Sequence, residues 1–490
     1  MLISTKKVKH MIPRYIIISV ALSTMAIGCL TRSVPQYVDI SINIKGRNDT
    51  VFSIVSLDPL TYEEHILSET GIDSSGEGHA RLRLPGPRFV WLNIGDHAHP
   101  IFLAPGLDID ISFGPDGPSE DISFKGRGAI ANGYLANTHG MIKRLHAHHS
   151  NIMSQDLERF TTILDSMSNV LDTFHKDYVD STSLPLEISE IMKVHGQLCL
   201  LNIGQNYRMV HGDKLKNSSG WISTEPPFDA RYLDLGMIEY AMALDRYLQT
   251  KIYPPIWEKN KSEAASHTRE RLPLISVKKI KNSNFPREIQ GFLEAKNIGY
   301  WLKMEGITPL IDSMYRDYKR ISNRPEYMTT LEEEYQDWLA IAKGRSAPGI
   351  SVMDDQGNPF SLEDQKGKVV YIDIWATWCG PCIKGFPHYE RLMEGLAEQM
   401  DDITFLFLSV DKDTGKWQDF LKEKDLPEGI HLIEKADGQH LSIYETYKIW
   451  GIPRYIILDR EGRIIDANAP GPFSKKISRT LLDTIDGKKT

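Results

Sequence analysis

The spacing of hydrophobic residues differs among three consecutive regions of the chain, and each spacing predicts a different kind of structure. Apolar and polar residues alternate over positions 38–44 and again over 107–113, as they do in strands that bury one face. Clusters such as Pro85-Gly86-Pro87 mark turns between strands of this kind. We therefore expect residues 34–124 to form a β-rich domain, a small sandwich of antiparallel strands.

From residue 125 to 343 the apolar residues recur every three or four positions, which is typical of amphipathic helices. One stripe alternates steps of four and three along a single predicted helix, at Met153, Leu157, Phe160, Leu164, Met167, Leu171, Phe174 and Tyr178. Such a stripe suits either a coiled-coil dimer or a bundle within one chain. The bundle is favoured because further amphipathic segments follow at 184–209, 232–248, 286–304 and 327–342.

The third region, residues 346–490, alternates strands and helices. Its residues 369–375 form a nearly continuous apolar run, which indicates a central strand covered on both faces. After it we expect an amphipathic helix to about Met400, a buried strand at 404–410 and a helix through Trp417 and Leu421. Strands at 430–434 and 454–458 follow, with a hairpin to 464–465. This order predicts an α/β domain with βαβ units. The whole chain is thus expected to be multidomain.

Composition narrows the class of protein. The 490 residues are 41% hydrophobic and 25% charged, which excludes a polytopic membrane protein, a collagen-like fibre and a largely disordered chain. With 65 acidic against 57 basic residues, the net charge of −8 gives no electrostatic reason to bind nucleic acid. Four cysteines in a chain of this length exclude a disulfide-stapled scaffold.

The amino terminus has the layout of a secretory signal, in which cationic residues precede an apolar run over positions 15–28. This run is shorter than the ~20 residues that a spanning helix needs. It ends in Ala26-Ile27-Gly28-Cys29, which resembles the cleavage box of a bacterial lipoprotein, with Ala26 where Leu is usual. The resemblance implies that residues 1–28 are a signal peptide. An uncleaved anchor, or a signal cleaved elsewhere, is the alternative.

The same resemblance implies that Cys29 is lipidated and holds the mature chain on a membrane of the cell envelope. The four residues after Cys29 contain no acidic cluster. An acidic cluster at that place would resemble the surface-export tag of Bacteroidota lipoproteins. We therefore expect a lipid-anchored, periplasm-facing protein.

Two cysteines stand close together, directly after the central apolar strand, in Trp378-Cys379-Gly380-Pro381-Cys382. A structural zinc site would need a second pair of ligands at similar spacing. A static disulfide across so small a loop would constrain the unfolded chain little. A redox-active dithiol fits better, because the unpaired N–H groups at a helix start favour a thiolate there.

The histidines and the remaining cysteine suggest no further site. His139, His146, His148 and His149 cluster, as do His97 and His99, but no nearby cysteine or well-placed carboxylate completes a ligand set. A solvated polar face is therefore expected, and no metal. Cys199 lies in an apolar stretch, where a buried and inert thiol is expected.

Residues 346–487 resemble the thioredoxin superfamily, and specifically the periplasmic TlpA/ResA-like thiol-disulfide oxidoreductases. The resemblance rests on the five-residue dithiol motif, on Pro387 five residues after Cys382, on Asp373 in the preceding strand and on Gly451-Ile452-Pro453 before an apolar strand. In that family a buried carboxylate lies beneath the dithiol and a cis-proline faces it. Residues 101–106 resemble the amino-terminal domain of Bacteroidota thioredoxin-like lipoproteins.

Two features of the residues around the dithiol distinguish this chain from related families. Many TlpA/ResA-like proteins carry Glu three residues after the second cysteine, where this chain has Gly385. Proton transfer would then depend on Asp373 or on water. Peroxiredoxins share the fold, but their pattern needs a proline and a threonine where this chain has Ile372 and Ala376.

The resemblance implies a role for each motif residue. Cys379 would attack a substrate disulfide and Cys382 would resolve the mixed disulfide. Asp373 would accept the proton of Cys382, as a buried carboxylate with a raised pKa can. Backbone groups of Ile452, beside the cis peptide of Pro453, would bind the substrate chain together with Trp378, Gly380 and Pro381. No cofactor is implied beyond the redox-active disulfide.

The function expected is reduction of disulfides in exported proteins, within cell redox homeostasis, with electrons supplied by a transmembrane thiol relay. The alternative is a disulfide oxidase or isomerase, which would use the same residues but with a different net direction of electron transfer. A protein of another class is the further alternative, namely a binding or scaffold lipoprotein. In it the β and helical domains would recruit a partner, and the thioredoxin-like domain would be accessory.

Overall fold

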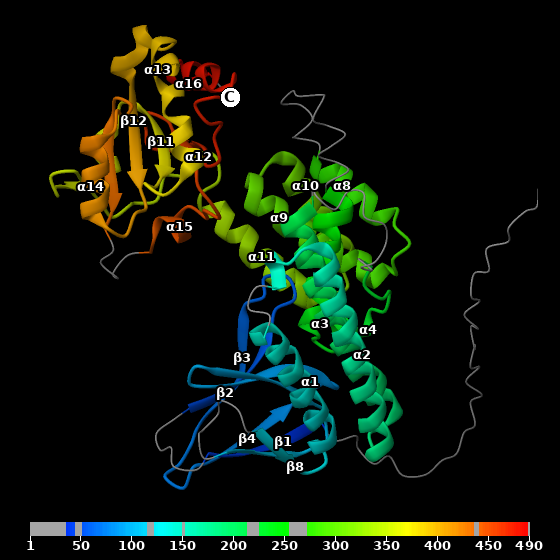
Figure 1. Ribbon diagram of the computed structural model, residues 1–490. Helices are drawn as coiled ribbons and strands as arrows, with labels where there is room; N and C mark the ends of the chain where they lie inside the picture. Colours follow the sequence, from blue (N-terminus) through cyan, green and yellow to red (C-terminus); the bar gives the residue numbers. More distant parts are fainter. Residues whose placement is uncertain are drawn as a thin grey trace, which may run out of the picture.

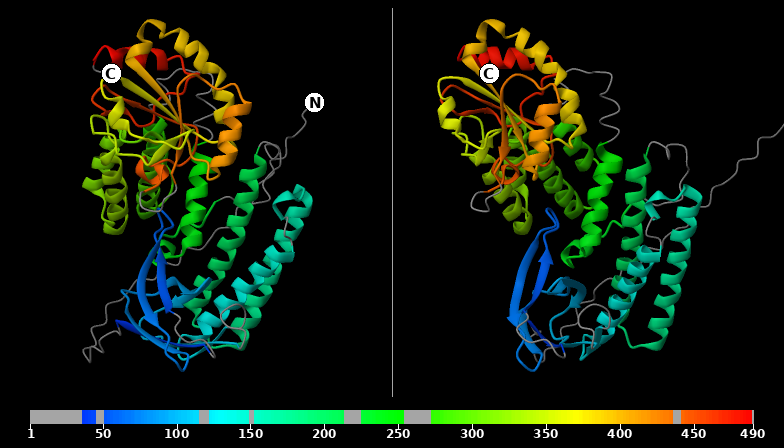
Figure 2. Two further views of the ribbon diagram at one scale, coloured as in Figure 1. Left: turned by 90° about the vertical axis from the view of Figure 1, so that its left-hand side faces the viewer. Right: turned by 60° about the vertical axis from the view of Figure 1, so that its left-hand side comes forward.

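The structure, a computed structural model, describes residues 36–44, 51–114, 122–148, 152–212, 225–253, 272–435 and 441–488. The expected signal peptide and Cys29 lie outside these residues. A β region and an α/β region occupy opposite ends of the molecule, and a helical region joins them along one side (Figure 1, Figure 2). Over the described residues, no helix combines the length and the apolar character needed to cross a bilayer.

The β region is a sandwich of two four-stranded sheets. Its strands are β1 (Tyr37–Asn43), β2 (Val51–Leu57), β3 (Glu64–Gly71), β4 (Glu77–Arg83), β5 (Arg88–Ile94), β6 (His97–Leu103), β7 (Ile109–Phe113) and β8 (Ile122–Lys125). The sheets have the orders β4-β1-β7-β8 and β3-β2-β5-β6. Ile40 and Ile42 from one sheet share a buried core with Phe52 and Leu92 from the other, because alternate residues of each strand point inward.

The predicted sandwich is confirmed, but the expectation that all its strands are antiparallel is wrong. Strands β1 and β7 run parallel, with Ile40 opposite Ile109 and Ile42 opposite Ile111. The chain crosses to the second sheet through β5 and β6 before it returns beside β1. A connection of that length allows the strand to enter in either direction.

The helical region begins at Ala129, four residues after β8 ends at Lys125. Its helices are α1 (Ala129–His148), α2 (Leu157–Ser181), α3 (Leu186–His211), α4 (Arg231–Asp234), α5 (Ile238–Tyr247), α8 (Leu272–Lys281), α9 (Arg287–Glu305), α10 (Pro309–Ile321) and α11 (Pro325–Ala340). A 3₁₀ turn (Ile152–Ser154) precedes α2, and a π-helical turn (Leu248–Ile252) extends α5.

The apolar stripe packs within the chain, as the bundle interpretation predicts, although Met153 lies in the 3₁₀ turn before α2 and not on the helix. Phe160, Met167 and Leu171 are buried, and the Phe160 ring stacks on Tyr207 of α3 with ring centroids 3.7 Å apart. The amphipathic segment predicted over 232–248 forms two helices, because Gly236 has a φ of 65° between α4 and α5. A left-handed conformation of this kind ends a helix.

Polar contacts attach the helices to the β region. The Asn132 side chain of α1 pairs with both backbone groups of Phe102 on β6, accepting from its N–H and donating to its carbonyl, each at 2.8 Å. Between β2 and β3, Asp58 accepts a hydrogen bond of 2.6 Å from Thr330 of α11. The β2–β3 hairpin thus reaches the helices that lie next to the α/β region (Figure 1).

The α/β region is a seven-stranded mixed sheet of order β10-β9-β13-β12-β11-β14-β15. Its strands are β9 (Val352–Asp354), β10 (Pro359–Phe360), β11 (Val369–Trp375), β12 (Ile403–Ser409), β13 (Ile430–Glu434), β14 (Arg454–Leu458) and β15 (Ile464–Asp466). Its helices are α12 (Gly380–Gly385), α13 (Pro387–Glu394), α14 (Thr414–Glu423), α15 (Ile443–Thr446) and α16 (Ile477–Ile485), with 3₁₀ turns at Leu362–Gln365 and Ala397–Asp402.

Strand β11 is the predicted central strand, and all seven of its residues are buried. It lies parallel to β12 on one side and antiparallel to β14 on the other. The helix expected to reach about Met400 is shorter than predicted, because α13 ends at Glu394. Pro387 starts a new helix, α13, because proline has no N–H to donate back to the preceding turn. The last turn before β12 is 3₁₀.

The helical region contacts the α/β region near the loop that precedes β14. The Lys303 ammonium of α9 lies over the Trp450 ring, 4.2 Å from its centroid. Lys448 forms an ion pair of 2.6 Å with Asp337 of α11. These contacts hold α9 and α11 beside the loop that carries Ile452 and Pro453.

Candidate active site

The dithiol lies where β11 passes into α12. Cys379 and Cys382 form a disulfide with an S–S distance of 1.99 Å and a Cα–Cα distance of 5.3 Å. Cys379 is the N-cap of α12, and its sulfur accepts a hydrogen bond of 3.2 Å from the backbone N–H of Cys382. This donor would stabilise a thiolate on Cys379 after reduction. In the oxidised state both residues are buried, Cys379 with 4% exposed and Cys382 with 1%.

The loop before the dithiol is fixed by Asp411, which follows β12. The backbone N–H and the hydroxyl of Thr377 each donate a hydrogen bond of 2.8 Å to its carboxylate. Ser409 donates another, at 2.7 Å. No local sequence pattern marks Asp411 or Thr377, because the two residues lie 34 positions apart and meet only through the pairing of β11 with β12.

Asp373 is buried in β11, two residues before the end of the strand. It has 2% of its surface exposed, and its Oδ2 accepts a hydrogen bond of 2.8 Å from the Tyr389 hydroxyl of α13. Its Oδ1 has no hydrogen-bond partner among the described residues. Burial raises the pKa of Asp373 to about 7, although the Tyr389 hydrogen bond opposes part of that shift. Asp373 can therefore exchange a proton near neutral pH.

Three buried tyrosines surround this carboxyl group. Tyr389 contacts it directly, and the rings of Tyr371 and Tyr455 stack with centroids 5.8 Å apart. Burial, and after it the charge of Asp373, raises the pKa of Tyr455 and of Tyr389. Tyr389 falls in the buried apolar series Phe386, Tyr389 and Leu392. A buried hydroxyl in such a series requires a partner, and that signal could have been found in the sequence.

Gly385, where the related family often has glutamate, is the last residue of α12 and is buried. A Cβ atom at this position would lie 3.6 Å from the Tyr455 hydroxyl. This is an ordinary van der Waals distance, so the Tyr455 hydroxyl from β14 lies directly beside the position where the related family often has glutamate.

The peptide bond between Ile452 and Pro453 is cis. Arg454 pairs with Ile374 in the antiparallel register of β14 and β11. The loop that carries Ile452 and the loop that carries Trp378 therefore leave the sheet at the same edge. The side chain of Trp378 is 67% exposed and that of Trp450 is 63% exposed. Exposed aromatic residues beside a reactive group commonly mark a surface that contacts a partner.

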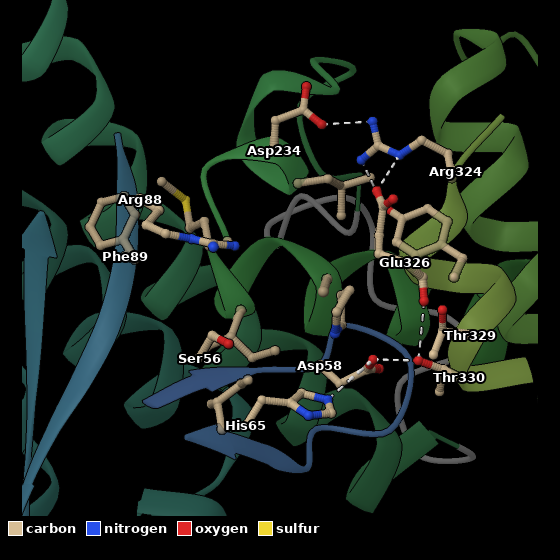
Figure 3. Close-up of a pocket in the computed structure, with 18 of the residues that line it drawn as sticks. Ser56, Asp58, His65, Arg88, Phe89, Asp234, Arg324, Glu326, Thr329 and Thr330 are labelled. Atoms are coloured by element: carbon tan, nitrogen blue, oxygen red, sulfur yellow. Dashed lines mark hydrogen bonds and ion pairs between the residues drawn. The ribbon is translucent and has the colours of Figure 1, made fainter. Parts of the chain in front are cut away.

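A pocket of about 590 Å³ lies between the β and helical regions, away from the dithiol (Figure 3). Arg324 bridges Asp234 and Glu326 at 2.7 Å each, and Asp58 lies between Thr330 and His65. Figure 3 shows the Arg88 side chain extending into the same space. Among the described residues, none from the α/β region lines this pocket. It is therefore not part of the thiol chemistry.

Comparison with known proteins gives matches to the α/β region. The Redoxin family model matches residues 342–479. The thioredoxin-like protein YneN of Bacillus subtilis (strain 168) is 33% identical over 145 residues, which are 30% of this chain and 81% of that protein. The thiol-disulfide oxidoreductase ResA of Bacillus cereus is 29% identical over 123 residues, 25% of this chain and 67% of that protein.

Among solved structures, a putative thiol-disulfide oxidoreductase from Bacteroides vulgatus is 35% identical, with a TM-score of 0.27, and covers 30% of this chain and 98% of that one. The fold and the dithiol together define a thioredoxin-like thiol-disulfide oxidoreductase. Through its carboxy-terminal third, the chain belongs to the redoxin family of thioredoxin-like proteins. The expected fold class and oxidoreductase activity are thereby confirmed.

Proposed function

We propose that this protein is a lipid-anchored, periplasm-facing enzyme of the cell envelope that reduces disulfide bonds of exported proteins. The observation that carries the chemistry is the Cys379–Cys382 disulfide at the start of α12. The anchor and the location are supported by the signal-like amino terminus and by Cys29.

The reaction begins with the reduced dithiol. The Cys379 thiolate attacks one sulfur of a substrate disulfide, so that a mixed disulfide forms and the other substrate sulfur leaves as a thiolate. Cys382 then loses its proton and attacks the sulfur of Cys379. The enzyme disulfide closes, the second substrate sulfur leaves, and two electrons have passed from the dithiol to the substrate.

Asp373 is the group that accepts the Cys382 proton in this proposal. Its Oδ1 has no competing hydrogen bond among the described residues, and its raised pKa of about 7 makes it a base of suitable strength near neutral pH. The proton then passes to water or to a departing substrate thiolate. Asp373 therefore returns to its starting state in each cycle.

The substrate chain binds along the two loops at the sheet edge. Backbone groups of Ile452 pair with the substrate, and Trp378, Gly380 and Pro381 contact it beside the reactive sulfur. Because α9 lies against the same loop at Trp450 and α11 lies against it at Lys448, both helices border the bound substrate. The helical region would in this way contribute to the choice of substrate.

Electrons must reach the dithiol from the cytoplasm, so a transmembrane thiol relay is the partner proposed for its regeneration. The reduction potential of the dithiol, measured in glutathione or dithiothreitol buffers, tests the direction. A value of about −250 mV or lower supports a reductase, whereas about −120 to −180 mV would indicate an oxidase or isomerase.

A trapping experiment tests the order of attack. Cys382→Ser should accumulate mixed disulfides through Cys379 when it is reduced and mixed with a disulfide-containing protein. The double variant Cys379→Ser/Cys382→Ser is the control and should trap nothing. Absence of adducts in the single variant would refute the assignment of Cys379 as nucleophile.

A separate labelling experiment tests the anchor. Cells that express the protein should incorporate a palmitate analogue into it, and the label should be lost in Cys29→Ser.

A further inference from the structure

Three residues of metal-ligating types meet in the helical region, away from the dithiol. They are His195 and Cys199 on α3 and Glu239 on α5, and one donor atom from each lies within 4.8 Å of the other two. Over the described residues, this is the one group of three or more His, Cys, Asp or Glu side chains with that geometry.

His195 is the most enclosed member of the group. It is 3% exposed, its Nε2 lies 3.4 Å from Oε2 of Glu239, and its Nδ1 has no hydrogen-bond partner among the described residues. The Phe89 ring of β5 stacks on the imidazole, with centroids 5.0 Å apart and planes 8° apart. The ring is therefore held in one orientation while one of its nitrogens stays unused.

The positions of the three donors follow from the helix geometry. His195 and Cys199 are four residues apart, which places both on the same face of α3. Glu239 lies in the first turn of α5, and its backbone carbonyl accepts a hydrogen bond of 2.8 Å from Asn202 of α3. This bond fixes α5 against α3, so the donors are brought together before any ligand arrives.

The donor set matches the chemistry of one kind of ion. Imidazole nitrogen, thiolate sulfur and carboxylate oxygen are the ligands that Zn²⁺ uses in tetrahedral sites, at about 2.0–2.3 Å. Donors around such an ion stand about 3.5 Å apart, which small side-chain rotations could achieve from the present separations. His139 of α1 lies near His195 and Glu239, but it is outside the group whose donor atoms all lie within 4.8 Å of one another.

We propose that His195, Cys199 and Glu239 bind one Zn²⁺ ion, which links α3 to α5 beneath strand β5. Binding would displace the thiol proton of Cys199 to solvent and would involve no electron transfer. Such a site would stabilise the helical region, because a metal bound only in the folded state adds its binding free energy to folding. The inference does not depend on the proposed reductase function.

Cobalt is the probe that tests the site, because it reports both ligand type and geometry. Full-length protein carrying Cys29→Ser, with the Cys379–Cys382 pair oxidised, leaves Cys199 as its one free thiol. We expect it to bind one equivalent of Co²⁺ with a sulfur-to-cobalt charge-transfer band and the intense visible bands of tetrahedral cobalt. Zn²⁺ should displace the cobalt and raise the thermal unfolding temperature.

Variants decide whether these residues are the ligands. Cys199→Ser should lose the charge-transfer band, and it should weaken binding by more than the about 100-fold that loss of an outer-shell partner can cause. His175→Gln on α2, a histidine outside the group, should change neither. The proposal would be overturned if the protein bound no stoichiometric Co²⁺, or if binding persisted unchanged in Cys199→Ser. If Cys199→Ser does not fold, Glu239→Gln decides, and unchanged affinity there would overturn it.

Discussion

The Tyr389 hydroxyl donates a 2.8 Å hydrogen bond to one oxygen of Asp373, and within the described part of the chain the other oxygen accepts none. A single neutral donor satisfies only part of what a buried carboxylate needs. Burial consequently raises the pKa of Asp373 to about 7, and the hydrogen bond keeps the pKa from rising further. Asp373 is therefore both a usable base and a source of instability when it is ionised.

We expect Asp373→Asn to stabilise the oxidised protein at high pH and to change little at low pH. The pKa of Asp373 is about 7 in the folded state and 3.8 in the unfolded reference, so the stability of the wild type falls as pH rises from about 4 to about 7 and levels off above that. Asparagine never ionises. At about 1.4 kcal/mol per pKa unit, the gain at pH 8.5 should be up to about 4 kcal/mol.

Urea unfolding at pH 4.5 and pH 8.5 measures this difference. Asp419→Asn, at an exposed position on α14, serves as the control and should show no pH-dependent gain. A stabilisation by Asp373→Asn that is equal at both pH values would contradict the assignment of a raised pKa.

Tyr389→Phe removes the hydrogen bond to Asp373 and should raise the pKa of that carboxyl group further, by about one unit. The pH midpoint of the second step, closure of the enzyme disulfide, should move upward by the same amount. Stopped-flow measurement of that step against pH provides the test. Tyr371→Phe is the matched control, because its hydroxyl donates to the Pro470 carbonyl and not to Asp373. Equal shifts in both variants would contradict this role for Tyr389.

The sequence located the parts of the site that are continuous in the chain. The apolar run of β11, the Cys379–Cys382 spacing and the Ile452–Pro453 pair each act within a few residues, so local pattern sufficed. Tyr455 and Asp411 were missed because they reach the site through the strand order β12-β11-β14. Sheet order depends on tertiary packing, which no local periodicity records.

The same limit explains the errors in the other regions. Gly236 lies inside a segment with convincing helical periodicity, but its left-handed conformation separates α4 from α5. The approach of Cys199 to Glu239 joins residues 40 positions apart on different helices. The sequence alone predicts an inert thiol at Cys199, since its neighbours in the chain are apolar and its neighbours in space depend on tertiary packing.

Trp450→Ala should impair exchange with protein substrates more than with a small disulfide. The ring is 63% exposed, two residues before Ile452, and is covered on one side by Lys303. An exposed side chain of this kind adds little to stability, but it offers a large contact area to a bound chain. We expect KM for a protein disulfide to rise several-fold, with turnover of an aromatic small disulfide unchanged. Leu441→Ala, also exposed, should change neither parameter, and equal losses on both substrates would contradict a binding role for Trp450.

Thr330→Val should weaken the attachment of the β2–β3 hairpin to α11. Asp58 is 8% exposed and accepts from the Thr330 hydroxyl at 2.6 Å as well as from the backbone of Leu60 at 2.7 Å. Valine keeps the shape of threonine but leaves one buried carboxylate oxygen without this donor, which costs about 1–3 kcal/mol. Thermal unfolding should show the loss, whereas Thr329→Val, at the exposed neighbouring position, should not. If the two variants unfolded alike, the Asp58–Thr330 contact would contribute nothing to the joining of the β and helical regions.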